Sequence, residues 1–501
     1  MSERTSPVRR SRRGSAGLRA DVLGRSDTIV MAVAGSAPAY SIAGSAASLI
    51  ATVGFAGPAA LLYCAIPMIG IAWAFNYLGR LDVNAGASYS WVARALHPSL
   101  GFMSGWALVM SATIFMVAGS LPAGSATLAL VDPAQANNTA LATTIGAAWF
   151  LVMLGIVIAG VTFTAKAQWV MTGVEVGIIL VFGVIAVVRG GGAAKFSWSW
   201  FAINHFPHGM AGFAAGVLVA AFFFWGWDVT SNLSEETKQS HRTSGVGGLI
   251  GVAVVFVIFE LYAVAINMDL PADTVANNPG DVLSVLGDTV WHGPGGKILI
   301  VAVMLSTIAT LETTLIQVSR TLFAMGRDRT IPSAFGNVHP RWQTPWVATL
   351  AVGGVALVLF VASNAVGSVG TIMGDAVQAI GLQIAVYYAL AGIAVVVAYR
   401  KTLTHSVKNF VFIGVWPLAG ALFMMWVFYE ALPTLNTTTK SVGLGALALG
   451  FIPMVWYWRK GSSYYHPARL DASHAVALDL TYDGLDTELV SSSAGGLMTD
   501  L

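Results

Sequence analysis

The sequence GSAPAYS at residues 35–41 interrupts an apolar run that covers about residues 28–53. Pro38 has no N–H to donate within a helix, and Gly35 leaves helical geometry at little steric cost. A second interruption, FFFWGWD at residues 222–228, places a glycine, crowded aromatic rings and an acid inside another apolar run. Either interruption alone is more typical of a packing kink. Unwound backbone inside a bilayer is tolerated only where protein buries it or where it lines a cavity, so the two together indicate a functional interior.

The composition surrounding these stretches is that of a membrane protein. Of 501 residues, 56% are hydrophobic and 10% charged, and the mean hydropathy is +0.72. A soluble domain carries about 25% charged residues, because its surface must be hydrated. The one cysteine, Cys64, lies in an apolar run, so neither an intrachain disulfide nor thiol chemistry is indicated.

Twelve segments are apolar over roughly the 20 residues that a helix needs to span a bilayer. They cover about residues 28–53, 57–79, 101–130, 141–163, 167–188, 208–233, 246–268, 297–325, 346–363, 370–398, 410–431 and 441–458. With the amino terminus in the cytosol, the outer connections contain only four of the 26 basic residues: Arg189, Lys195, Lys297 and Lys440. Cytosolic loops carry the excess of Lys and Arg, so the sequence predicts twelve spans in the cell membrane (inner or plasma), with both termini cytosolic.

The predicted organisation has three parts. A basic cytosolic tail covers residues 1–25, a twelve-helix domain covers 26–460, and a polar, Ser-rich cytosolic tail, interpreted as disordered, covers 461–501. An arginine-rich tail can bind nucleic acid, but beside so many spans it indicates topology and contact with lipid headgroups, and no nucleic-acid partner is expected. The sequence contains neither a P-loop nor a metal-binding cluster, so an ATP-driven pump and a metal cofactor are not indicated.

The two interruptions occupy matching places in the predicted order of helices. They fall in helices 1 and 6, the first members of two five-helix halves at about 26–190 and 207–400, which helices 11 and 12 follow at about 410–459. Because five is odd, the two halves must be inverted relative to each other. Interrupted helices at matching positions of inverted repeats point to the substrate site of a secondary transporter, where freed amides meet a carboxylate and freed carbonyls meet an ammonium group.

Several motifs resemble those of the amino acid–polyamine–organocation (APC) superfamily of permeases. The block FFFWGWDVTSNLSEET at 222–237 is similar to the family's aromatic-Gly-aromatic-acid signature with its Glu-Glu pair. The stretch SRTLFAMGRD at 319–328, followed by Pro332, His-Pro and Thr-Pro, is similar to the family pattern, with Arg329-Thr330 where glycine is usual. GASYSWV at 86–92 resembles the first inner loop. The resemblance covers roughly residues 25–460.

This resemblance implies the leucine-transporter fold and proton- or sodium-coupled uptake, or exchange, of amino acids or amines by alternating access, without an enzymatic activity. The substrate site that it implies comprises Ser36, Ala37, Pro38, Ala39, Tyr40, Phe222, Phe223, Trp225 and Asp228. Phe222 is expected to act as the aromatic gate. The chain departs from the family at two positions: Pro38 removes an amide that a substrate carboxylate would use, and Glu175 stands where many members have a lysine in place of sodium.

Three acids lie deep in predicted helices 5, 7 and 8: Glu175, Glu260 and Glu312. A carboxylate at mid-bilayer costs at least about 2.5 kcal/mol, so such an acid is a functional candidate. Glu175 shares a helix face with Gln168 and Thr172. We expect Glu175 and Glu312 to couple a proton or another cation to transport, and consider Glu260 more typical of a structural group. Asp228 is as suited to capping the second half of helix 6 as to binding a ligand.

Alternatives remain open from the sequence alone. Within transport, the extra acids favour a diamine or polyamine importer or exchanger, and the family as a whole favours amino acids. A channel or a membrane sensor is the alternative of another class. Glu235 and Glu236 lie at the predicted cytosolic end of helix 6, where a gating ion pair is possible but a solvated loop is the more typical role. The sequence does not indicate an oligomeric state.

Overall fold

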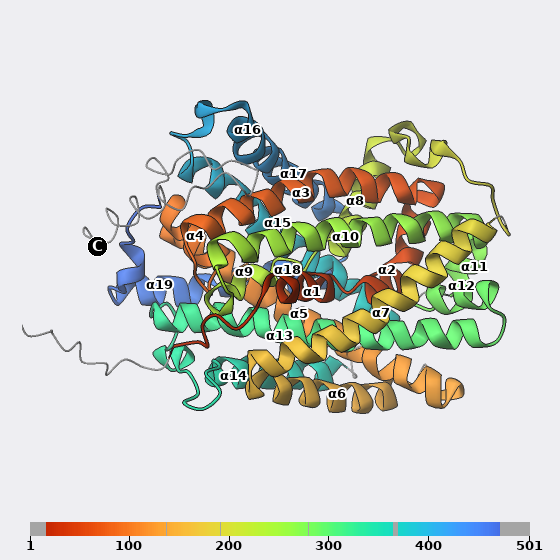
Figure 1. The fold of residues 1–501 in the computed structure, drawn as a ribbon, viewed down its shortest axis with the longest axis horizontal. Coiled ribbons are helices and arrows are strands. Elements are labelled where there is room, and N and C mark those ends of the chain that lie inside the picture. Colours follow the sequence, from red (N-terminus) through yellow and green to blue (C-terminus); the bar gives the residue numbers. More distant parts are fainter. Residues whose placement is uncertain (1–16, 137, 191, 279, 364–368, 471–501) are drawn as a thin grey trace, which may run out of the picture.

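A computed structural model describes residues 17–136, 138–190, 192–278, 280–363 and 369–470. Within this part of the chain the structure is helical, apart from a parallel β-bridge between Leu23 and Thr237. The long helices lie along the longest dimension of the molecule (Figure 1). The prediction of an all-α protein is therefore confirmed.

Each predicted apolar segment forms a helix or a pair of helices. These are α1 (Arg25–Ser36) with α2 (Pro38–Val53), α3 (Gly57–Leu81), α5 (Pro98–Val131), α6 (Thr139–Ala159), α7 (Val161–Arg189), α8 (Met210–Phe223) with α9 (Val229–Asn232), α10 (Ser240–Asp269), α13 (Pro294–Arg327), α14 (Trp346–Ser363), α15 (Val369–Ala398), α17 (Trp416–Thr434), and α18 (Thr437–Leu449) with α19 (Phe451–Arg459). The short helices between them are α4 (Ser88–Ala95), α11 (Ala272–Asn277), α12 (Val282–Val290) and α16 (Val407–Asn409).

Within the described residues, 10 helical stretches are long and apolar enough to cross a membrane. One of them, Arg25–Leu81, is 57 residues long and combines α1, α2 and α3. The helix α8 is apolar but shorter. The chain is thus a multi-pass membrane protein.

The first interruption separates α1 from α2 at a single residue. Ala37 has φ 47° and ψ 65°, a left-handed conformation that is unusual for a residue other than glycine. Pro38 is the first residue of α2, where its fixed φ suits the helix and its missing N–H has no intrahelical partner to lose. Pro38 therefore begins a second half-helix instead of kinking a continuous one.

The second interruption separates α8 from α9. The helix α8 ends at Phe223, and the chain turns through Gly226, whose φ of 97° favours glycine, before α9 begins at Val229. A short 3₁₀ helix, η5 (Ser234–Glu236), follows α9. Both interruptions predicted from the sequence are present in the structure.

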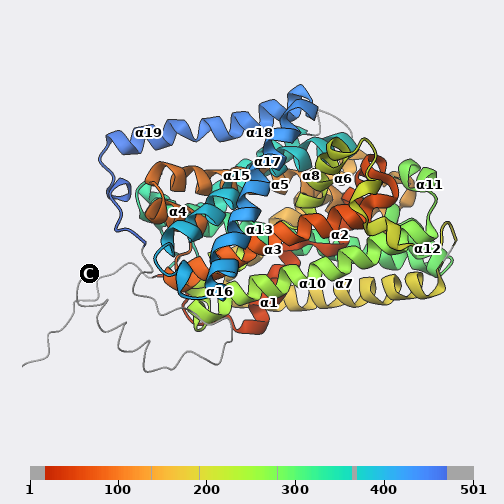
Figure 2. The ribbon, with the colours of Figure 1, turned by 90° about the horizontal axis from the view of Figure 1, so that it is seen from above.

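The long helices pack closely around the interruptions. The helix α13 contacts α5, α7, α1 and α2, and α3 packs against α10. At the periphery, α18 and α19 extend along one edge of the molecule, opposite α7 and α10 (Figure 2). Only 11% of the most apolar part of the stretch Thr437–Arg459 is buried, which fits a helix that faces lipid.

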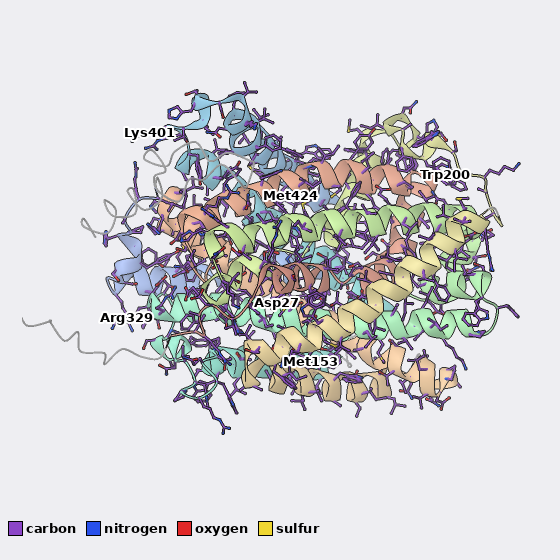
Figure 3. The ribbon with its side chains drawn as sticks, in the orientation of Figure 1. Asp27, Met153, Trp200, Arg329, Lys401 and Met424 are labelled. Atoms are coloured by element: carbon purple, nitrogen blue, oxygen red, sulfur yellow. The ribbon has the colours of Figure 1, made fainter. Side chains whose placement is uncertain are left out.

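The two ends of the molecule differ in the residues that they carry. Arg329 and Lys401 lie at the same end, and Trp200 lies at the opposite end (Figure 3). The short helices α4 and α19 lie at the end of Arg329, whereas α11 and α12 lie at the end of Trp200 (Figure 1). This arrangement brings together connections that the charge pattern assigns to the same side of the membrane.

The predicted carboxy-terminal tail is in part packed against the protein. The short 3₁₀ helix η9 (Ser463–Tyr465) places Tyr464 parallel to the ring of Tyr89 in α4, with centroids 4.7 Å apart, and the Leu470 amide donates to the Arg94 carbonyl. Residues 461–470 therefore do not form the disordered segment that the sequence suggested. Tyr464 and Leu470 belong to the hydrophobic core, and the polar average composition of the tail gives no sign of these contacts. The rest of this tail, 471–501, and residues 1–16 of the amino-terminal tail lie outside the described residues.

Candidate functional site

The two interruptions meet through glycines. A Cβ atom added to Gly35 would collide with the carbonyl group of Gly226, and a Cβ added to Gly226 would collide with that of Gly35. Because both obstacles are backbone atoms, neither glycine can be replaced without moving a helix. The interrupted helices therefore form one structural centre.

Glu175 of α7 contacts this centre directly. Its Oε1 accepts a hydrogen bond from the Ala39 amide at 3.0 Å, in the first turn of α2, where amides have no partner within the helix. The next amide, Tyr40, donates to the Ser306 hydroxyl of α13 at 3.2 Å. Across the interruption, the Thr310 hydroxyl donates to the Gly35 carbonyl at 3.1 Å. Glu175 is fully buried, and its Oε2 has no partner in the structure.

The other predicted residues of the first interruption lie in the same turn. The Ser36 hydroxyl donates to the Ala32 carbonyl at 3.2 Å, and the Ser36 carbonyl accepts from the Ser41 hydroxyl at 2.9 Å. Ala37 and Ala39 are buried like Ser36. The backbone, more than the side chains, supplies the polar groups at this turn.

Aromatic rings cover the meeting point. Phe115 of α5 lies 5.8 Å from Tyr40, 6.5 Å from Phe222 and 5.4 Å from Trp225 between ring centroids. The ring of Phe223 instead contacts Phe259 of α10 at 5.0 Å. The structure thus gathers Tyr40, Phe222 and Trp225 around Phe115, and leaves Phe223 outside this group.

Asp228 accepts hydrogen bonds from three neutral side chains. Tyr388 donates to Oδ1 at 3.0 Å, whereas Tyr387 and Gln317 donate to Oδ2 at 3.1 and 2.8 Å. Tyr387 also accepts from the Trp225 indole N–H at 2.6 Å. The Asp228 side chain does not cap α9, so that sequence-based alternative is wrong. The carboxylate is oriented by α13 and α15 and is linked to the aromatic group through Trp225.

Glu312 forms a separate pair with Gln168. The Gln168 amide donates to Glu312 Oε2 at 2.6 Å and to the Ala309 carbonyl at 2.8 Å, and both side chains are fully buried. Glu260 of α10 has no hydrogen-bond partner for either carboxyl oxygen in the structure. Of the three acids singled out in the sequence, Glu175 alone contacts an interruption.

Several residues of this centre were not among the site residues predicted from the sequence. They are Phe115, Ser306, Thr310, Gln317, Tyr387 and Tyr388. Two signals were visible in the sequence. Ser306, Thr310 and Gln317 form a polar side of one apolar segment, and a Tyr-Tyr pair lies in another, where a tyrosine hydroxyl needs a partner. Whether a residue of α5, α13 or α15 belongs to this centre depends on which face of its helix meets the interruptions.

Two ion pairs connect the segment after α9 to α13, at the end of the molecule that carries Arg329. Glu236 receives two hydrogen bonds from the Arg320 guanidinium, at 2.9 and 3.0 Å, and neither side chain is exposed. Glu235 pairs with Arg327 at 2.9 Å and also accepts from the Ala85 amide. The expectation of a solvated loop at Glu235 and Glu236 is wrong, because both carboxylates form ion pairs with arginines of α13.

The chain's relatives are transporters. A family profile described as "Amino acid permease" matches residues 23–452. The low-affinity putrescine importer PlaP of Escherichia coli (strain K12) is 27% identical over 422 residues, which cover 79% of this chain and 84% of PlaP. The methylthioribose transporter of Bacillus subtilis (strain 168) is 25% identical over 391 residues, which cover 75% and 80% of the two chains. A serine/threonine exchanger of the same bacterium, SteT, is 25% identical over 259 residues, which cover 50% and 55%.

The match to the family spans most of the chain and includes both interruptions, the acids of α7 and α13, and the paired glutamates after α9. Membership in this family makes the protein a carrier and not an enzyme, and implies amino acid or polyamine substrates. The chain therefore belongs to the amino acid permease family, within the APC superfamily of transporters.

Proposed function

We propose that this protein is a proton-coupled importer that carries an amine-bearing metabolite by alternating access. The substrate would bind between the two interruptions, against the backbone of Ser36, Ala37, Pro38 and Ala39 and beneath Tyr40, Phe222 and Trp225. The carbonyls of Phe222, Phe223 and Trp225 at the second interruption and the Asp228 carboxylate would meet its ammonium group. The close contact between the interruptions and the polar groups collected there support this placement.

The observation that carries proton coupling is the hydrogen bond from Ala39 to Glu175. A hydrogen bond to an ionised carboxylate is roughly twice as strong as one between neutral groups. Loss of a proton from Glu175 would therefore strengthen its hold on the first turn of α2, and gain of a proton would weaken it. Because α2 is half of an interrupted helix, proton binding would change the helix that contacts the substrate.

The acids favour a diamine or polyamine over a simple amino acid. Asp228 and Glu175 receive hydrogen bonds from neutral donors alone in the described contacts, so each is able to receive an ammonium group. Pro38 lacks the N–H that a substrate carboxylate would use. The putrescine importer among the relatives agrees with this chemistry. Amino acid transport is the second candidate, supported by the exchanger for serine and threonine.

The same proposal extends to the architecture. We count α1 with α2 and α8 with α9 as single interrupted spans, which gives twelve spans with two inverted five-helix repeats. We place both termini in the cytosol and the protein in the cell membrane. The end with the ion pairs of Arg320 and Arg327 would then face the cytosol, in keeping with the excess of Lys and Arg there.

The test is uptake by proteoliposomes that contain the Glu175→Gln variant. Glutamine keeps the shape and accepts the Ala39 hydrogen bond, but cannot carry the charge. We expect loss of proton-driven accumulation with substrate exchange retained, whereas the Glu260→Gln control should accumulate like the unchanged protein. In the unchanged protein, uptake should rise when the outside is acidified and collapse with an uncoupler. Accumulation by Glu175→Gln with unaltered pH dependence would refute the role of Glu175.

A thermal-shift screen of purified protein against amino acids and amines would identify the substrate for these assays. A diamine should raise the unfolding temperature more than its monoamine analogue if two acids contact it, because binding to the folded state alone stabilises that state. If Glu175→Gln removes the shift for diamines only, Glu175 is a substrate ligand instead of a coupling residue.

A further inference from the structure

Glu175 and Glu312 share an unusual pattern of hydrogen bonds. In each carboxyl group one oxygen accepts from an amide N–H: Glu175 Oε1 from Ala39 and Glu312 Oε2 from Gln168. The other oxygen, Glu175 Oε2 or Glu312 Oε1, is buried without a well-aligned donor, and the hydroxyls of Ser306 and Thr164 lie close to the two carboxyl groups. A buried carboxylate with an unpaired oxygen is costly, whereas a protonated carboxyl keeps its O–H on the oxygen that accepts nothing. Both groups are therefore built to hold a proton on a defined atom.

Among the contacts of the described residues, Glu312 has no partner of opposite charge. The helices α5, α6 and α14, which pack against α13, contain no Asp, Glu, His, Lys or Arg within their bounds. On α7 the polar side chains toward α13 are Gln168, Thr172 and Thr164, with Glu175 beyond them, and the nearby Lys166 is exposed. The first charged group farther along α13 is Arg320, which is already paired with Glu236. Two further acids contact α13: Asp228 accepts from Gln317, and Asp288 of α12 accepts from the Gly296 amide. On α1 and α2 the titratable groups are Tyr40 at the interruption and, in the first turn of α1, Arg25 and Asp27.

Glu312 lies between Glu175 and the end of the molecule where the ion pairs gather. On α13 it follows Ser306, the neighbour of the interruption, by six residues, or about 9 Å at 1.5 Å per residue. On α7 its partner Gln168 precedes Glu175 by seven residues, or about 10 Å in the same direction. Between them, the Thr172 hydroxyl donates to Gln168 Oε1 at 3.4 Å. A line of polar groups thus leads away from the interruption.

We propose that Glu312 is a second proton-binding residue, which takes the proton released by Glu175 and passes it to the side of the membrane where α13 ends. This inference rests on the proposed proton coupling through Glu175. The two carboxyl groups do not touch, so the transfer needs water that enters between α7 and α13. In the first step the O–H bond of Glu175 breaks, this water carries the proton to ionised Glu312, an O–H bond forms at Oε1, and the negative charge moves to Glu175. In the second step Glu312 gives the proton to water that enters when this side opens.

Gln168 is the positioning residue of this site. Its amide nitrogen uses both hydrogens, one on Glu312 Oε2 and one on the Ala309 carbonyl, which fixes the side chain against α13. Because the Gln168 amide occupies Oε2, the proton is exchanged at the other carboxyl oxygen, Oε1. It also stabilises the anion that Glu312 forms after release.

The test is infrared spectroscopy of purified full-length protein during a rapid rise in pH, which needs no substrate. The unchanged protein should lose carboxylic-acid carbonyl bands from both residues. Glu312→Gln should lack one band from the start and lose the Glu175 band more slowly, by on the order of a hundredfold, the usual contribution of a positioned proton acceptor. Glu260→Gln, which alters an acid outside this line, should keep the rate. Gln168→Leu should retain the Glu312 band at a higher frequency, since a donor to the carboxyl is gone.

The outcomes separate this inference from the proposed function. If Glu312→Gln removes no band, or if the Glu175 band decays at the unchanged rate, the second site is refuted while Glu175 keeps its role. If Glu175→Gln removes no band, the proposed coupling itself fails. Glu312→Gln retains an acceptor for the Gln168 amide, and an unchanged unfolding temperature would show that a slower rate is not a folding defect.

Discussion

At the scale of single residues, the contact between Gly35 and Gly226 allows a sharp test of the centre. Gly226→Ala would place a methyl group against the Gly35 carbonyl at a φ of 97°, a conformation that costs an L-residue about 1–3 kcal/mol. We expect uptake to fall about tenfold or more, because this energy is comparable to one decade in rate. Gly445→Ala is the matched control, since its Cβ would meet no atom within 4 Å. Normal uptake by Gly226→Ala would mean that the interruptions separate easily.

The aromatic group offers a second test at this scale. Trp225→Ala removes both the ring against Phe115 and the hydrogen bond to Tyr387, which orients Asp228. Trp225→Ala and Phe222→Ala, each as a single change, should abolish uptake while the amount of protein in the membrane stays near normal. Trp198→Ala, at a side chain that is 78% exposed, is the control. Transport by both variants would place the substrate elsewhere.

The residues at this scale also show what the sequence could predict. Pro38, Gly226 and Glu175 were identifiable because each is chemically out of place in a lipid-spanning helix. Tyr387, Tyr388 and Phe115 were not, because aromatic residues in apolar helices acquire a role only through the partner helix that they face. The positive φ of Arg329, 57°, explains why glycine is usual at that position of the family motif.

At the scale of elements, apolar length predicted the helices well, and most bounds agree with the structure within a few residues. The connections were predicted less well. The segment after α9 looks like a solvated loop in the sequence, yet the buried pair of Glu236 and Arg320 fastens it to α13. The density of charged residues along the sequence does not reveal that Arg320 of α13 points inward toward this segment.

This ion pair leads to a prediction about stability. Removing one member of a buried pair costs about 3–5 kcal/mol, because the other charge stays buried alone, whereas replacing both with apolar groups costs much less. Glu236→Leu should therefore lower the unfolding temperature strongly, and Arg320→Met added to it should restore most of the loss. Glu235→Gln should have a small effect, since the pair with Arg327 is partly exposed. Additive losses in a double-mutant cycle of thermal unfolding would show that the pair is uncoupled.

At the scale of the whole molecule, the proposed topology is open to direct labelling. A reporter of membrane sidedness fused at Ser284, in α12, should be active only outside the cell, and one fused at Gly336, after α13, only inside. The cationic connection around Arg327, Arg329 and Arg341 resists translocation. Labelling of both positions on one side would overturn the count of twelve spans.

The positions of the charged side chains bear on the energy that a cationic substrate gains from the membrane voltage. The acids between the helices are held by amides and hydroxyls, and the ion pairs that the structure describes lie together at one end. The acids belong to the protein and do not cross the membrane with the substrate. In the proposed import an organic cation therefore crosses together with protons and without an anion, and its charge would experience the membrane voltage. At 100 mV, negative inside, each charge gains about 2.3 kcal/mol, equivalent to about a 50-fold concentration ratio. A diamine would thus be concentrated by voltage as well as by protons, and uptake would be electrogenic.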